Sequence, residues 1–238
     1  MRKCAIIERC VFILNRIGSF MKTKDKIIHT ALAMFNEHGE RNVTTNHIAA
    51  QLGISPGNLY YHFRNKEDII HSIFDQYVTY LAEHFQPHRE GDVTLEVMMN
   101  YLDSMFETMW QFRFFYYSLP ILLSRDPELH KKYLKFQEVS AQREVDLLFS
   151  LQKNKVVNVP IEDLDDLANS IKVVLVSWVS YRTTISKDAK IYKTDIYRGI
   201  LKSLFMMKPY FTQQAHEDYQ HMRDYYLRLC NVDAHSNQ

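Results

Sequence analysis

The chain has 238 residues, a formal net charge of +1 and 46% hydrophobic residues, which is enough for one large domain or for a small domain joined to a larger one. Six glycines and six prolines are too few for the turns of an all-β fold, and repeated helical periodicity predicts an all-α protein. Three cysteines without metal or redox spacing exclude a disulfide scaffold and indicate free thiols in a reducing cytoplasm.

Residues 1–20 differ in character from the rest of the chain. Glu8, Arg9 and Arg16 interrupt their apolar run, which becomes too short for an export signal or a membrane span. Met21 precedes a sequence that suits a first helix, so we expect translation to begin there and residues 1–20 to be a start-site artefact or a disordered arm. The competing interpretation is a basic arm that contacts DNA.

The first helix is expected to begin at Thr23, whose hydroxyl can cap it, and to end at Gly39. Its apolar residues recur at helical spacing and form one face, which consists of Ile27, Ile28, Ala31, Leu32 and Phe35. This helix would support the segment that comes next.

Residues 44–66 predict two short helices joined by a tight turn. A hydroxyl of Thr44 or Thr45 can cap the first helix, because it accepts a hydrogen bond from a backbone N–H that lacks an intrahelical partner. Gly53 suits the C-terminal end of that helix, since glycine enters the left-handed conformation without steric cost. Ser55 can cap the second helix, with Pro56 at its first position.

The second of these helices has an apolar side and a polar aromatic side. Leu59 and Phe63 lie four residues apart and are expected to face inward. The outward side is left with residues that all form hydrogen bonds: Asn58, Tyr60, Tyr61 and His62. The segment therefore predicts a helix-turn-helix with a reading face on its second helix.

The charges around this segment support a DNA-facing surface only locally. Residues 41–66 contain three basic residues and no acidic residue, whereas Glu40 and Glu67 lie directly outside that window. Phosphate repels carboxylates, so a window without acids suits contact with the DNA backbone. Because residues 22–76 carry six basic and six acidic residues, binding would depend on backbone amides, hydroxyls and helix N-termini.

The run from Thr44 to Glu67, with Leu52-Gly53-Ile54-Ser55 and Leu59-Tyr60-x-His62-Phe63 inside it, closely resembles the N-terminal signature of TetR-type (TetR/AcrR) bacterial transcriptional regulators. The resemblance covers residues 22–75. That family usually has an aromatic residue after the glycine that closes the first helix, whereas Glu40 follows Gly39 in this chain.

The resemblance implies a helix-turn-helix DNA-binding domain over residues 22–82, a helical regulatory and dimerisation domain over 83–230 and a frayed tail over 231–238. It further implies a homodimer that binds a palindromic operator, because one short helix contacts only a few base pairs. His62 is interpreted as a DNA contact or a packed helix tip, and Lys66 as a phosphate contact or a solvated lysine. The expected DNA-contacting residues are Thr44, Thr45, Asn46, Ser55, Pro56, Gly57, Asn58, Tyr60, Tyr61, His62 and Lys66.

A further helix is expected after Asn65, which can cap it, with Glu67 and Asp68 in a first turn that favours anions. Its apolar positions continue to Leu81, before a break marked by Pro87 and Gly91. In the TetR pattern this helix connects the DNA-binding domain to the rest of the chain.

An apolar stripe with helical spacing begins at Thr94 and runs into an aromatic segment before Pro120. Methionines repack easily and aromatic rings supply contact area, so this stripe suits a pocket for a small apolar or aromatic effector. The alternative is that it is simply core. The candidate effector-binding residues are Met98, Tyr101, Met105, Met109, Phe112, Arg113, Tyr116 and Trp178.

Four more helices are expected, at about residues 126–153, 162–185, 192–207 and 212–229. The helix over 162–185 is apolar on more than one side, which favours a subunit interface over the interior of a single bundle. TetR-like proteins dimerise through their last long helices, and small residues would allow close approach. The candidate interface residues are Val173, Val176, Ser177, Ser180, Ile196, Gly199, Ile200 and Ser203.

The sequence contains no phosphate-binding glycine loop, nucleophile elbow or His-Glu-x-x-His motif, so no enzymatic activity, metal or cofactor is expected. His84 and His88 have no third metal ligand nearby, and the acids at 162–166 are interpreted as first-turn helix residues. The leading hypothesis is a cytoplasmic, effector-responsive transcriptional repressor. The alternative is a helical small-molecule-binding protein with a non-functional DNA-binding domain.

Overall fold

A computed structural model of the chain describes residues 22–85 and 93–232. Within them the secondary structure is helical, apart from an isolated antiparallel bridge between Val157 and Phe211. The all-α prediction is therefore confirmed. The expectations for residues 1–20, for Pro87, His88 and Gly91, and for the tail beyond residue 232 lie outside the described residues.

The chain forms two compact units, which meet in sequence between Asp75 and Gln76. We call the described residues 22–75 the head and the described residues from 76 onward the body. The helix α5, Lys66–His84, begins in the head and ends in the body. The sequence-based boundary at residues 82 and 83 lay near the end of this helix.

The head contains α2, Thr23–His38, the 3₁₀ turn η1, Glu40–Asn42, then α3, Thr45–Leu52, and α4, Pro56–His62, followed by the first half of α5. The apolar face predicted for the first helix is buried in full. The predicted cap differs, because Thr23 is the first helical residue and Lys22 precedes it without a side-chain cap. The buried apolar residues that the rest of the head contributes include Ile48, Leu59, Phe63, Ile69, Ile70 and Ile73.

The body contains longer helices joined by short connections. They are α6, Leu95–Gln111; α7, Arg113–Arg125; α8, Pro127–Lys153; α9, Leu164–Ile185; α10, Lys193–Met207; and α11, His216–Val232. Two 3₁₀ turns, η2 at Ile161–Asp163 and η3 at Lys208–Tyr210, lie between them. The four helices predicted after residue 120 are thus found close to their expected positions.

Side-chain and backbone signals explain two helix boundaries in the body. Asp126 caps α8, since its carboxylate accepts from the backbone N–H of Leu129 at 2.9 Å, and Pro127 occupies the first position of the helix. The long apolar stripe from residue 94 is interrupted at Phe112, where α6 ends and α7 begins. Pro120 lies inside α7 and does not end it.

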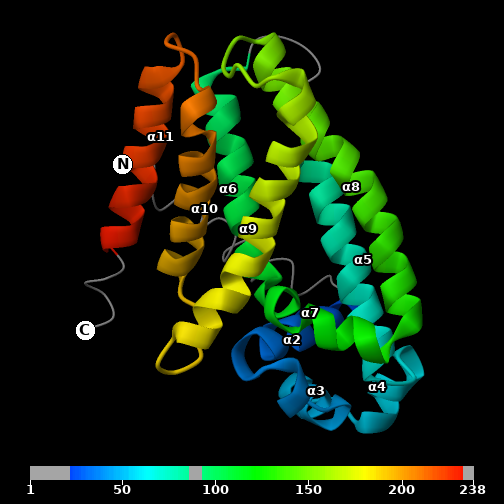
Figure 1. The fold of residues 1–238 in the computed structure, drawn as a ribbon. Helices are drawn as coiled ribbons and strands as arrows, with labels where there is room; N and C mark the ends of the chain where they lie inside the picture. Colours follow the sequence, from blue (N-terminus) through cyan, green and yellow to red (C-terminus); the bar gives the residue numbers. More distant parts are fainter. Residues whose placement is uncertain (1–21, 86–92, 233–238) are drawn as a thin grey trace. The chain divides into compact units, whose positions relative to one another are not determined.

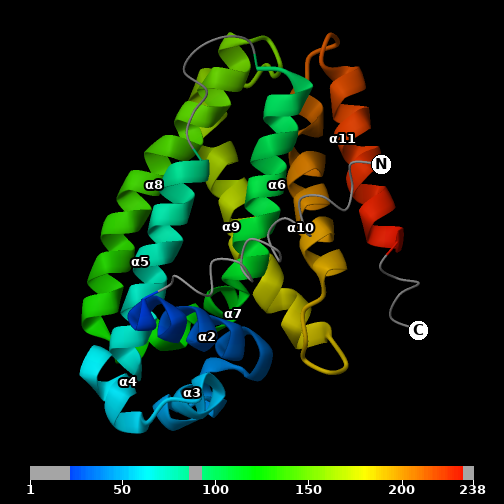
Figure 2. The ribbon, with the colours of Figure 1, turned by 180° about the vertical axis from the view of Figure 1, so that it is seen from behind.

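The helix α10 packs against α6, α9 and α11, and α9 also packs against α7 and α8. Figures 1 and 2 show α11, α10 and α6 side by side, with α9 next to α10. Buried residues from α6, α9, α10 and α11 meet in one core, in which the Phe106 ring stacks on the Tyr197 ring at 4.3 Å. Cys230 is buried in this core, and its thiol donates to the carbonyl oxygen of Thr194 at 3.9 Å. No helix in the described ranges is both long enough and apolar enough to cross a membrane.

Candidate nucleic-acid interface

The first helix of the predicted helix-turn-helix, α3, is capped by Thr44. The Thr44 hydroxyl accepts from the backbone N–H of His47 at 3.2 Å, and the Thr44 N–H donates to His47 Nδ1 at 3.4 Å. At the other end Gly53 has φ 66° and ψ 29°, the left-handed conformation expected of it. Both ends of α3 are therefore determined by local residues, as the sequence predicted.

The second helix, α4, begins where Ser55 caps it. The Ser55 hydroxyl accepts from the backbone N–H of Asn58 at 3.2 Å, and Pro56 follows at the first helical position. Leu59 is fully buried and Phe63 nearly so, which anchors one side of this seven-residue helix in the core of the head. The opposite side is thereby directed outward.

The outward side of α4 carries the predicted reading residues. Tyr61 is 86% exposed, the Tyr61 and His62 rings meet edge to face at 5.1 Å, and Asn58 is also exposed. These residues offer a phenol hydroxyl, an imidazole and an amide, which hydrogen-bond to base edges or phosphates. Exposed positions near the two helix starts complete this surface: Thr44, Asn46, Ser55, Pro56 and Gly57.

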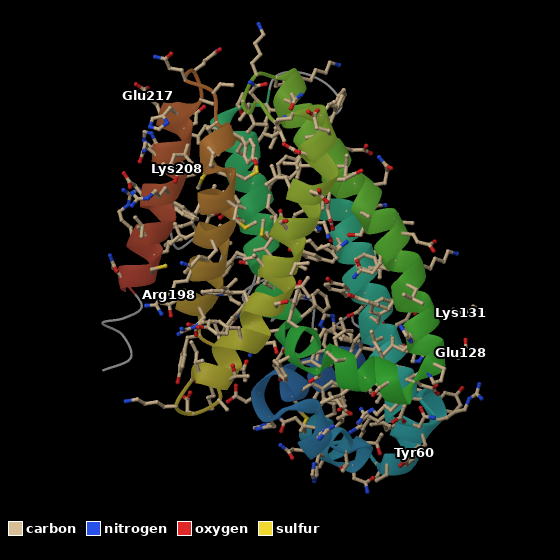
Figure 3. The ribbon with its side chains drawn as sticks, viewed as in Figure 1. Tyr60, Glu128, Lys131, Arg198, Lys208 and Glu217 are labelled. Atoms are coloured by element: carbon tan, nitrogen blue, oxygen red, sulfur yellow. The ribbon has the colours of Figure 1, made fainter. Side chains whose placement is uncertain are left out.

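Tyr60 has a structural partner that the sequence did not reveal. Its hydroxyl lies 3.0 Å from the hydroxyl of Thr45, the first residue of α3, and its side chain is 49% exposed. Figure 3 labels Tyr60 on the ribbon of α4. The two hydroxyls link the helices of the motif across fifteen residues of sequence. No pattern at that spacing would have predicted the link.

Lys66, predicted to contact phosphate, has partners inside the head. Its ammonium donates to the carbonyl oxygens of Glu40 at 3.0 Å and Val43 at 3.1 Å, and it pairs with the Glu40 carboxylate at 2.8 Å. An ammonium group has three N–H donors, so these three oxygens use all of them. The Lys66 ammonium is therefore directed into the head, whereas the sequence predicted a phosphate contact.

Comparison with known proteins decides the family. Residues 27–73 match the family described as bacterial regulatory proteins of the tetR family, and residues 76–219 match one described as a bacterial transcriptional repressor. A crystal structure of a TetR-family transcriptional regulator from Marinobacter aquaeolei VT8 is 36% identical, covers 87% of this chain and 99% of its own, and has a TM-score of 0.78. The chain belongs to the TetR family of bacterial transcriptional regulators.

Two further relatives agree with this assignment. IcaR of Staphylococcus epidermidis, the negative transcriptional regulator of the biofilm operon icaADBC, is 25% identical over 193 residues, 78% of this chain and 100% of IcaR. The ketosteroid transcriptional regulator KstR2 of Mycobacterium tuberculosis shares the fold, with a TM-score of 0.57 at 18% identity, 81% coverage of this chain and 96% of its own. TetR-family regulators are not enzymes, as the sequence predicted.

The effector-binding residues predicted for this TetR-family regulator are only partly brought together. Tyr77 of α5 meets the rings of Phe112 at 5.3 Å, Phe136 at 5.6 Å and Tyr116 at 6.3 Å. Its hydroxyl lies 3.5 Å from that of Tyr116, and burial raises the pKa of Tyr116 to about 12. We call Tyr77, Phe112, Tyr116 and Phe136 the aromatic cluster. Tyr77 and Phe136 were not among the predicted residues, because nothing local indicates that α5 and α8 meet α7.

The other predicted effector residues have different surroundings. Met98 and Met109 are buried in the body core, and Met105 packs against it. The Arg113 guanidinium lies over the Trp110 ring at 4.2 Å and donates to the Trp110 carbonyl at 2.8 Å. Tyr101 is half-buried on α6.

Trp178 serves the contact between α9 and α10. Its indole N–H donates to the Asp195 carbonyl at 2.6 Å, and a Cβ built on Gly199 would lie 2.6 Å from the indole ring. The Asp195 carboxylate accepts from Arg182 at 2.7 Å, and Arg198, labelled in Figure 3, lies 3.7 Å away. The Trp178 side chain therefore packs on α10, whereas the sequence predicted that it lines the effector pocket.

The predicted dimer residues divide into two groups. Those on α10 are buried against other helices of the same chain and expose little surface to a partner subunit: Ile196, Gly199, Ile200 and Ser203. Helical periodicity showed that α10 has an apolar face but not which neighbour covers it, and α6, α9 and α11 do so. On α9, Val173 is 54% exposed, Ser177 is exposed, and Val176 and Ser180 are half-buried.

Proposed function

We propose that this TetR-family regulator is a homodimeric repressor that inserts α4 of each subunit into the major groove of a palindromic operator, and that a small apolar or aromatic effector releases it. IcaR is a negative regulator, and we extend that sign to this chain. The observation that carries the DNA-binding part is the exposed face of α4, centred on Tyr61 and Asn58 in a window without acidic side chains. A regulator of this kind would act in the cytoplasm.

Exposed residues on α9 and α10 support the proposed dimer, and they differ in part from the interface residues predicted from the sequence. Val173, Ser177 and Tyr181 repeat every four residues on α9, and all three are exposed. On the neighbouring helix α10, Phe205 is 68% exposed. Apolar side chains exposed together on packed helices mark association surfaces. A twofold pair of heads would read two half-sites about one helical turn, roughly 34 Å, apart.

The effector part is supported by the aromatic cluster. The clustered rings supply apolar contact area, and the two hydroxyls can orient one polar group of a ligand. Burial raises the pKa of both Tyr77 and Tyr116, so these phenols stay neutral at physiological pH. Because this buried cluster would remove a ligand from water, a neutral or weakly polar aromatic compound would fit better than an anion. Native mass spectrometry after incubation with metabolite pools would identify it.

Operator binding is tested with two substitutions on α4. We expect Tyr61→Ala and Asn58→Ala each to reduce the preference for the operator over bulk competitor by about 1–3 kcal/mol, because each removes a base contact. Gln51→Ala is the matched control, since Gln51 is exposed on α3 in a pocket that it shares with α2 residues such as His29. Mobility shifts on the gene's own upstream region measure all three. Unchanged operator preference in both α4 variants would show that α4 does not read the bases.

The dimer face is tested separately by introducing charge. Phe205→Glu should yield monomers in sedimentation equilibrium, because a carboxylate would be buried without a partner in the interface. Leu134→Glu is the control, since Leu134 is 52% exposed on α8 and lies outside the proposed face. If the Phe205→Glu protein remains dimeric, or if only Leu134→Glu dissociates the dimer, the interface lies outside the proposed face.

A further inference from the structure

The corner between η1 and the start of α5 contains an ion pair inside the head. Glu40 is 2% exposed and Lys66 is 20% exposed, and their charged groups are 2.8 Å apart. The same ammonium donates to the carbonyl oxygens of Glu40 and Val43. One side chain on α5 thus joins both ends of the turn that precedes α3.

The position of Lys66 needs these partners. It is the first residue of α5, where the helix dipole disfavours a cation, and Glu67 and Asp68 behind it are the acids that the dipole favours. Removing the Glu40 carboxylate from water costs free energy, which the opposite charge of Lys66 at 2.8 Å helps to offset. The two residues therefore depend on each other, and the pair persists only while η1 and α5 keep their present geometry.

The pair acts on the part of the chain that orients the reading face. Val43, whose carbonyl oxygen Lys66 holds, is directly followed by Thr44, the cap of α3. α3 is linked to α4 through the Thr45 and Tyr60 hydroxyls, and α4 is followed within four residues by Lys66 itself. The contacts therefore link η1, α3, α4 and α5 to one another, and α4 is connected to its neighbours at both ends.

We propose that Glu40 and Lys66 are positioning residues for operator binding: their ion pair fixes the orientation of α4, and Lys66 contributes to DNA affinity through this geometry, without contacting phosphate. The proposal rests on the proposed operator binding by α4. Arg64, two residues before Lys66, lies in the same window without acidic residues, but its side chain is exposed. The proposal therefore gives Lys66 a different role from that of an exposed basic residue.

The test uses the full-length protein with Lys66→Met, Glu40→Leu, the double variant, and Arg64→Met as the charge-matched control. Operator affinity is measured at several salt concentrations, and thermal unfolding is recorded for each protein. Lys66→Met should lower both the melting temperature and operator affinity, the latter at least about tenfold, because it removes the opposite charge beside a buried carboxylate. The slope of log affinity against log salt should stay as in the wild type.

The Glu40→Leu variant distinguishes a positioning role of Lys66 from a direct contact between Lys66 and a DNA phosphate. It removes a negative group near DNA and frees an ammonium donor, so a phosphate-contacting Lys66 would bind more tightly and give a steeper salt dependence in this variant. The proposal predicts weaker operator binding instead. The double variant should bind more tightly than Lys66→Met alone, since an apolar pair leaves no buried carboxylate in the corner.

Two results would overturn the proposal. One is a Lys66→Met protein with the wild-type melting temperature and a salt slope smaller by about 0.9, which is the signature of one lost phosphate contact. The other is tighter operator binding by Glu40→Leu. Failure of the proposed function gives a different result, because the wild type and Arg64→Met would then show no preference for any genomic fragment over competitor.

Discussion

Different interactions stabilise the head and the body of this regulator. In the head, α3 and α4 have eight and seven residues, and each begins at a side-chain cap, Thr44 and Ser55. In the body, α8 and α9 have 27 and 22 residues, and their neighbours bury a core to which α6, α9, α10 and α11 all contribute. Both units bury apolar side chains, but the short helices of the head also depend on their caps and on the ion pair between Lys66 and Glu40, whereas the body depends on interleaved side chains from distant segments.

This difference indicates where substitutions should matter. A short helix is marginal by itself, so its caps and its few buried anchors carry a large share of its stability. A long helix in an interdigitated core tolerates loss of a cap but not loss of volume. Substitutions in both units test that contrast, and their expected effects range from several kcal/mol in the body core to less than one at a titrating carboxyl.

The largest effect is expected in the body core. Phe106→Ala removes a ring that is 5% exposed and stacked on Tyr197, and should lower the free energy of unfolding by about 3–5 kcal/mol. Chemical denaturation measures it. Phe149→Ala is the control, because that ring is 51% exposed on α8 and its loss should cost little. Equal losses in the two variants would show that the body does not depend on this core.

The same exchange of glycine for alanine should have opposite effects in the two units. Gly199→Ala places a methyl group 2.6 Å from the Trp178 indole, which must move, and should cost about 1–3 kcal/mol. Gly57→Ala in α4 meets nothing nearer than the Ser55 hydroxyl at 3.9 Å, and should stabilise the head by about 0.5–1 kcal/mol. Melting temperatures that shift in the same direction in both variants would contradict this contrast.

The cap of α4 tests the dependence of the head on local hydrogen bonds. Ser55→Ala removes the acceptor for the Asn58 N–H and should cost about 1 kcal/mol of stability. Hydrogen exchange of the α4 amides should speed up accordingly. Ser55→Asp retains an acceptor at the cap and should preserve the exchange rates, whereas equal acceleration by both substitutions would show that the cap is not the cause.

The smallest effect concerns pH. Burial raises the pKa of the Asp103 carboxyl, although the Tyr226 hydroxyl that donates to it at 2.6 Å acts in the opposite direction. The folded state therefore holds this proton more tightly than the unfolded state, so this group's contribution to stability falls as the pH rises from about 4. Asp103→Asn keeps an acceptor for the Tyr226 hydroxyl, and it should remove the decrease in stability that ionisation of Asp103 causes.

At neutral pH the Asp103→Asn protein should be more stable by less than about 1 kcal/mol, since partial exposure screens the charge. Urea unfolding at pH 4 and pH 7 measures both the gain and its pH dependence. A variant that is less stable than the wild type at pH 7 would show that ionised Asp103 is favoured in the fold.

The contrast between the units also explains what could be predicted from the sequence. Caps, Gly53 and Pro56 act within a few residues, so the limits of α3 and α4 and the outward direction of Tyr61 could be derived from the sequence alone. The partners of Lys66 and Tyr60 lie 26 and 15 residues away, and no local pattern indicates them. The positioning role proposed for Lys66 therefore rests on the structure and not on a sequence pattern.

In the body, periodicity located the helices but not their neighbours. An apolar stripe states that a face is buried without stating what buries it. Gly199 was correctly expected to allow a close helix approach, but the helix that approaches is α9 of the same chain and not a partner subunit. Tyr77 belongs to the aromatic cluster because α5 packs near α7 and α8, and no sequence pattern predicts that packing.

The proposed function depends above all on two copies of α4 reading one operator. Hydroxyl-radical footprinting on the gene's own upstream region, with the protein-to-DNA ratio determined by sedimentation on the same fragment, tests this most directly. We expect two protected half-sites related by a dyad and separated by about one helical turn, with two chains bound per site. A single protected site bound by one chain, or uniform protection without sequence preference, would contradict it.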